Sequence, residues 1–141
     1  MVTIFDPLGT PTPVYNRGGT TLITMAAGPS VDPAISDGAP EIPCLSEWTV
    51  ALVTTGHDGY PVPQRVILPS EADIGSVIEV YLVTTVSYQP NGLVLFPPVG
   101  TSFGPGYTIN TGTTTNIGLT ITDGTLFRKV DASTWRIMSR S

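Results

Sequence analysis

Few side chains in this sequence could support catalysis. The chain has one histidine, His57, and one cysteine, Cys44. Together they could form a nucleophilic dyad, in which the imidazole takes the proton of the thiol. His57 stands in the run Thr-Gly-His-Asp-Gly-Tyr, which is typical of a turn, so the simpler interpretation is an exposed turn histidine. A lone cysteine is commonly a small buried thiol. We therefore expect no catalytic residues and no enzymatic activity.

The sequence also lacks the patterns of metal and cofactor sites. Cys44 and His57 alone cannot meet the spacing of a structural zinc site, which needs several Cys or His residues. Asp32, Asp37 and Glu41 lie close together in sequence, but their spacing lacks the alternating oxygen ligands of a calcium loop. No glycine-rich stretch has the Lys and Ser or Thr of a phosphate-binding loop. We expect no metal ion and no cofactor.

The aromatic residues have two possible uses. Trp48 and Trp135 each have an aliphatic residue two positions further on, and this pattern predicts that both pack in the core. Stacking on sugar rings stays open for Tyr60, Tyr88 and Tyr107, because each of these lies beside a turn signal.

The charge composition narrows the classes of partner. Charged residues make up 12% of the chain, against about 25% in an ordinary soluble domain. The net charge is −5 and Lys129 is the sole lysine, so a phosphate backbone would find few cations and we expect no nucleic-acid binding. No run approaches the roughly 18 apolar residues of a membrane helix, and the first residues lack the basic start of a signal peptide. The composition indicates a soluble protein made in the cytosol.

The 141 residues suffice for one domain. With 15 glycines and 14 prolines, turn signals are too frequent for long helices, which predicts an all-β fold. About nine strands are expected from β-branched and aromatic runs. They are 20–26, 48–54, 65–68, 76–86, 92–96, 106–110, 116–122, 125–130 and 133–138.

Three local features carry these assignments further. Asp123-Gly124 suits a tight turn, so 116–122 and 125–130 are predicted to form a hairpin. In the longest strand, Glu79 shares one face with its odd-numbered neighbours, so the even-numbered face is the expected core face. The run 69–75 has capping residues at both ends and predicts a single turn rather than a helix.

The first 46 residues differ from the rest. They hold seven prolines and show no sustained periodicity apart from 20–26, but they are too apolar for a disordered tail. We expect an extended Pro-rich arm with one short strand over 1–46, followed by a β-sandwich domain over 47–141. This arm lies either on its own domain or on a neighbouring molecule.

Part of the chain resembles a known group of virion proteins. Three segments resemble a pattern of tailed-phage proteins. They are Val66-Ile-Leu-Pro-Ser-Glu-Ala-Asp-Ile-Gly-Ser-Val-Ile-Glu-Val-Tyr81, Gly92-Leu-Val-Leu-Phe-Pro-Pro-Val-Gly100 and Gly124-Thr-Leu-Phe-Arg-Lys-Val-Asp-Ala-Ser-Thr-Trp135. In that pattern a small turn starts a long strand, a Pro-Pro-x-Gly corner follows, and a last hairpin ends in tryptophan. Length and the Pro-rich arm fit best with the capsid cement, or decoration, proteins of short-tailed phages.

The resemblance implies a jelly-roll sandwich that forms homodimers and clamps the major capsid protein from outside the shell. The virion would then be its location after synthesis in the host cytoplasm. Such a protein acts through binding energy alone, and repeated weak contacts add by avidity. We expect the arm to touch the shell through Ile4, Phe5, Leu8, Val14, Tyr15 and Arg17. Packing of these residues on their own domain is the alternative.

A second hypothesis comes from another functional class. Head fibres and tail proteins of phages carry similar strands, so the chain could instead be a receptor- or glycan-binding module. That hypothesis predicts a trimer and an exposed aromatic platform. A third and weaker one is a small hydrolase built on Cys44 and His57.

Overall fold

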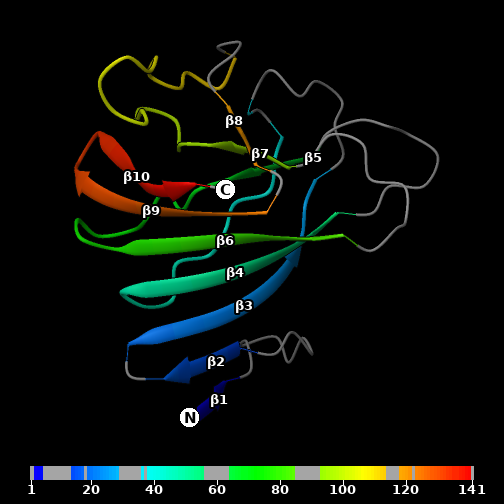
Figure 1. Cartoon of the computed structure of the whole chain (residues 1–141). Coiled ribbons are helices and arrows are strands. Elements are labelled where there is room, and N and C mark those ends of the chain that lie inside the picture. Colours follow the sequence, from blue (N-terminus) through cyan, green and yellow to red (C-terminus); the bar gives the residue numbers. More distant parts are fainter. Residues whose placement is uncertain are drawn as a thin grey trace.

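The computed structural model has an all-β architecture (Figure 1). Its described part contains no helix, and therefore none that could cross a membrane. The residues that the structure describes are 2–4, 14–17, 19–28, 36, 38–55, 64–84, 93–113, 118–121 and 123–140.

Seven strands form the larger of two sheets, in the order β1-β2-β3-β4-β6-β9-β10. All neighbours in it are antiparallel except β3 with β4 and β4 with β6, which are parallel. The strand bounds are Val2–Ile4 (β1), Val14–Arg17 (β2), Thr20–Ala26 (β3), Trp48–Thr55 (β4), Val77–Thr84 (β6), Gly124–Asp131 (β9) and Thr134–Arg140 (β10).

The smaller sheet has the order β5-β7-β8, with bounds Gln64–Ile67, Leu93–Phe96 and Leu119–Ile121. β5 and β7 are parallel, and β8 is antiparallel to β7. From β4 to β7 the chain alternates between the two sheets. Each return to a sheet is therefore a crossover, which is the connection that parallel neighbours require.

A shared core joins the two sheets. Its buried side chains come from the larger sheet, such as Val80, Phe127 and Trp135, and from the smaller one, such as Val66 and Leu95. Phe127 stacks on Phe103 with ring centroids 5.5 Å apart. Because the core lies between two sheets, the arrangement is consistent with a β-sandwich.

Most predicted strands are confirmed. The range 20–26 matches β3 at both ends, and 48–54 and 92–96 agree with β4 and β7 to within one residue. The even-numbered face of β6 is the core face, since Ile78 and Val80 are fully buried. The run 69–75 is a turn with no helix, as predicted, and Gly75 ends it with a φ of 97°.

The predicted hairpin across Asp123-Gly124 is wrong. β8 belongs to the smaller sheet, whereas β9 pairs with β6 and β10. Gly124 has no positive φ, and a Cβ there would lie 2.7 Å from the ring of Tyr81. The glycine thus permits close approach of an aromatic ring rather than a turn, which is the other use of a side chain reduced to hydrogen. The observed hairpin joins β9 to β10 through Ala132 and Ser133.

The predicted strand over 106–110 is also wrong. Gly104 and Gly106 both have positive φ, and the amide of Tyr107 donates to the carbonyl of Gly104. The segment ends at Asn110, which is fully buried. Its amide group donates to Pro97 O and to the hydroxyl of Ser36, while its oxygen accepts from the amide of Gly112. Glycine turns and one side-chain anchor therefore override the β propensity of this run.

Within the first 46 residues, the described part of the chain has three strands where one was expected. β1 pairs with β2, β2 pairs with β3, and β3 runs parallel to β4 over its whole length. Further along, Gly28 and the segment 40–42 form backbone hydrogen bonds with β5. The division after residue 46 stays a prediction.

Candidate functional site

The predicted shell-contact residues fall on the edge strand β1, on its neighbour β2 and on the stretch of sequence between them. Ile4 lies in β1, opposite Val14 of β2, and Tyr15 lies opposite Leu22 of β3. Arg17 pairs with Thr20 at the start of β3. Phe5 and Leu8 lie outside the described residues. The strands β1 and β2 thus bring four of the six backbone positions to one edge of the larger sheet.

The larger sheet has an apolar side that no described segment covers. We call it the outer face, meaning the side turned away from the shared core. Alternation along each strand sets its members, because the core cluster takes Ala51, Val53, Ile78, Val80 and Phe127 from the opposite side. At its centre the outer face comprises Trp48, Val50 and Leu52 on β4, Glu79, Tyr81 and Val83 on β6, and Leu126, Arg128 and Val130 on β9.

One carboxylate holds two aromatic rings on the outer face. Trp48 Nε1 donates to Oε1 of Glu79, and the hydroxyl of Tyr81 donates to Oε2 at 2.7 Å. Trp48 is opposite Val77 in the register, so Glu79 is its diagonal neighbour on β6. The two rings are 38% and 40% exposed. Core packing is therefore confirmed for Trp135, which is fully buried, and wrong for Trp48.

This arrangement changes the titration of Tyr81. The hydrogen bond to Glu79 and the negative charge of that carboxylate raise the pKa of the Tyr81 hydroxyl above its ordinary value. We expect Glu79→Gln to lower the pKa of Tyr81 back toward about 10. The readout is ultraviolet absorbance in alkaline titration, taken as the difference between each protein and its Tyr81→Phe counterpart. Equal midpoints for the original chain and the Glu79→Gln variant would contradict the pairing.

The sign of the linked stability follows from the same hydrogen bond. Folding raises the pKa of Tyr81, so its contribution is complete below the unfolded pKa of about 10. That contribution is lost as the pH rises through the higher folded pKa.

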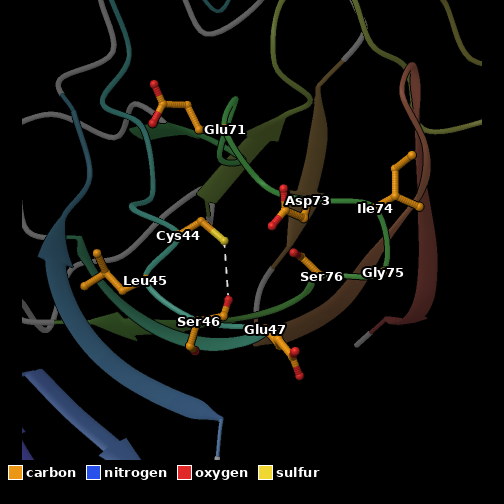
Figure 2. Close-up of a pocket in the computed structure, with 9 residues that line it drawn as sticks. All are labelled: Cys44, Leu45, Ser46, Glu47, Glu71, Asp73, Ile74, Gly75 and Ser76. Carbon is orange, nitrogen blue, oxygen red and sulfur yellow. Dashed lines mark hydrogen bonds between the residues drawn. The ribbon is translucent and has the colours of Figure 1, made fainter.

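An open acidic pocket lies where the segment before β4 meets the turn before β6 (Figure 2). Its volume is about 610 Å³. Figure 2 shows Glu71 and Glu47 at opposite sides of the pocket with Asp73 between them. Leu45 and Ile74 also line it and are 55% and 64% exposed. In the described part of the chain, no group of three His, Cys, Asp or Glu side chains could hold a metal ion.

The structure describes one member of each of the catalytic and calcium candidates, Cys44 and Glu41. Cys44 lines the pocket, and its thiol is 3.5 Å from the carbonyl of Ser46. Glu41 accepts a hydrogen bond from the backbone amide of Ser70. The other members of those candidate sites, His57, Asp32 and Asp37, lie outside the described residues.

Of the tyrosines proposed for sugar stacking, the structure describes one. Tyr107 is exposed and meets Phe103 edge-on, with ring centroids 5.7 Å apart. Tyr60 and Tyr88 lie outside the described residues.

Sequence reasoning missed the outer face, although the signal was present. β4 carries apolar residues at both parities, with Val50 and Leu52 on one side and Ala51 and Val53 on the other. A strand with one solvent-exposed face would alternate between apolar and polar residues. A near-continuous apolar run is typical of a strand that is covered on both faces.

Comparison with known proteins adds no relative: no family model, no curated protein and no solved structure matches this chain.

Proposed function

We propose that this chain is a structural virion protein that binds the outside of a phage capsid and clamps neighbouring major capsid subunits. It would reach the virion surface after synthesis in the host cytoplasm and act there as a homodimer, without catalysis. The support comes from the resemblance of three segments to capsid cement proteins and from the nature of the described surface. The jelly-roll form of the sandwich is part of the proposal, although the parallel pairs of the larger sheet differ from the antiparallel pattern of a jelly roll.

The observation that carries the proposal is the apolar outer face of the larger sheet. Three side chains on β4 and β6, Trp48, Tyr81 and Val83, each expose more than a third of their surface there. Contiguous apolar surface of this kind marks protein interaction sites. A protein with few charges and an apolar exposed face is suited to work by binding other proteins, which is all that a cement function requires.

The arm would supply the contacts to the shell. β1 is the end strand of the larger sheet, and an end strand can accept a strand from a partner through its free backbone groups. The strands β1 and β2 bring Ile4, Val14, Tyr15 and Arg17 to this edge. Because the backbone of β2 is bound to β3, contacts from β2 would be made by side chains.

The test of this function is the survival of phage heads. Heads that lack the protein are heated or diluted with and without it, and the release of packaged DNA is followed by fluorescence of an intercalating dye. We expect added protein to raise the temperature at which heads open, because separating two clamped subunits must also break the contacts of the clamp. Unchanged opening at saturating protein would overturn the proposal.

A second candidate is favoured by the exposure of Trp48 and Tyr81. Two rings held by one carboxylate on a sheet face form a small aromatic platform, as a glycan-binding module of a phage fibre would need. A glycan array separates the candidates. Sugar binding that is lost in Trp48→Ala would establish the fibre module, whereas the cement function predicts no sugar binding.

A further inference from the structure

The outer face has the properties of a surface that is covered in the working protein. Its centre is formed by β4, β6 and β9, and within this mixed sheet β4 runs parallel to both of its neighbours, β3 and β6. β4 is apolar at both parities, which is the pattern of strands that are covered on both faces. The shared core covers one face, and the outer face bears Val50, Leu52 and Val83 where solvent-facing strands carry polar residues. We propose that this face is the interface of a two-fold dimer whose axis runs along β6.

The area available matches a dimer interface. β4, β6 and β9 have eight residues each, which gives strands about 26 Å long. A partner centred on β6 overlaps the five strands from β3 to β10, a width of about 24 Å. Each copy therefore contributes about 600 Å², and the pair about 1,200 Å², which reaches the lower limit of specific, stable protein interfaces.

The side chains on either side of β6 are complementary under this symmetry. Rotation about β6 places the partner's β9 over β4. In one row of the register, Trp48, Val77 and Arg128 are neighbours, so the partner's Arg128 lies over the ring of Trp48, as in a cation–π contact. In the next row, Val50 and Leu126 flank Glu79, so the partner's Leu126 meets Val50. Both contacts occur twice, as an isologous interface requires.

The charges near the axis alternate in sign. Glu79 lies on β6 and would approach the partner's Glu79 across the axis. Arg128 is its diagonal neighbour on β9, and the partner's Arg128 lies over Trp48, whose Nε1 donates to Glu79. Two arginines thus flank the two carboxylates, and opposite charges arranged in this way fix the register of an interface.

The strand order also places the arms. β6 has four strands on the side of β1 but two on the side of β10. A partner centred on β6 therefore ends over β3, and β1 and β2 extend beyond it at each end of the dimer. Each β1 lies four strand spacings from the axis, so the two copies of β1 are about 40 Å apart. This step rests on the proposed function, since two separated arms would let one dimer reach two capsid subunits.

The test is the mass of the full chain in solution, by light scattering and sedimentation at several concentrations. We expect a dimer of twice 14.8 kDa. Tyr81→Asp adds two further carboxylates at the axis beside Glu79, so we expect the dissociation constant to rise about 100-fold with unchanged circular dichroism. The matched control is Ile74→Asp, because Ile74 is exposed on the turn before β6 and not on the outer face.

A second variant tests the position of the axis. Its result does not depend on whether the fold tolerates a new charge at position 81. Tyr81→Cys in a Cys44→Ser background should form an intermolecular cross-link with a bismaleimide reagent of about 10 Å span, because the axis places the two positions opposite each other at about the 10 Å spacing of packed sheets. Ile74→Cys in the same background should not. A monomer at tens of micromolar, or a dimer that neither Tyr81 variant affects, would overturn the proposal.

These outcomes are separable from the fate of the proposed function. A dimer of this kind that leaves phage heads unbound removes the cement function and keeps the interface. A monomer that binds heads and stabilises them removes the interface and the homodimer, and keeps the binding of this chain to the capsid.

Discussion

Replacing Trp135 with alanine should lower the free energy of unfolding by about 3–5 kcal/mol. Trp135 is among the largest fully buried side chains of the structure and lies in the core shared by both sheets. The loss is a large fraction of the roughly 5–15 kcal/mol that stabilises a typical domain. Urea unfolding followed by tryptophan fluorescence and circular dichroism measures this loss of free energy. In thermal unfolding, we expect Tm to fall by about 10–20 °C.

Two matched variants test whether the burial of the Trp135 ring causes this loss of stability. Trp135→Phe keeps an aromatic ring and removes Nε1, a buried donor without a hydrogen-bond partner among the described residues, so we expect it to cost far less than alanine. Trp48→Ala, measured in dilute protein where the proposed dimer is dissociated, should cost about 1 kcal/mol because the ring is part-exposed and loses one hydrogen bond. Equal costs for Trp48→Ala and Trp135→Ala would contradict the two environments described above.

Deleting residues 1–17 should abolish binding to phage heads while the domain stays folded. The deletion removes β1 and β2, which contain Ile4, Val14, Tyr15 and Arg17. β3 keeps its parallel pairing with β4 along its full length, so the core between the sheets is retained. Because a clamp gains affinity by engaging two subunits at once, we expect apparent affinity to fall by about 100-fold or more.

The control for this deletion is a surface change far from the arm in sequence. Val99→Asp alters an exposed residue in the segment that leads to Asn110, and should leave head binding intact. Binding by the shortened chain at full affinity would show that the arm packs on its own domain instead. Loss of folding in the shortened chain would point the same way, because it would make β1 and β2 structural strands.

Local pattern was sufficient for much of the fold. β3 was predicted at both ends because β-branched residues fill 20–26 between turn signals, and the 69–75 turn because Gly75 can adopt a positive φ. Contacts distant in sequence decided the rest. Asp123-Gly124 has the sequence of a hairpin turn. A glycine is needed there for another reason, because the ring of Tyr81, more than forty residues earlier in the chain, leaves no room for a side chain.

The site was less predictable than the strands, for a related reason. Whether Trp48 or Trp135 is buried depends on which face of its strand meets the second sheet, and both strands have apolar residues at both parities. The parallel pairing of β3, β4 and β6 depends on crossovers through the smaller sheet, for which no local sequence signal exists. Glu79 set the parity of β6 correctly, but its bonds to Trp48 and Tyr81 required the pairing of β4 with β6.

Co-sedimentation of the purified protein with phage heads that lack it tests the central claim most directly, with the mass of the free protein measured alongside by light scattering. The cement function predicts saturable binding by a dimer, at a fixed number of copies per head. A trimer that stays in the supernatant at every concentration would contradict it and would favour the fibre module.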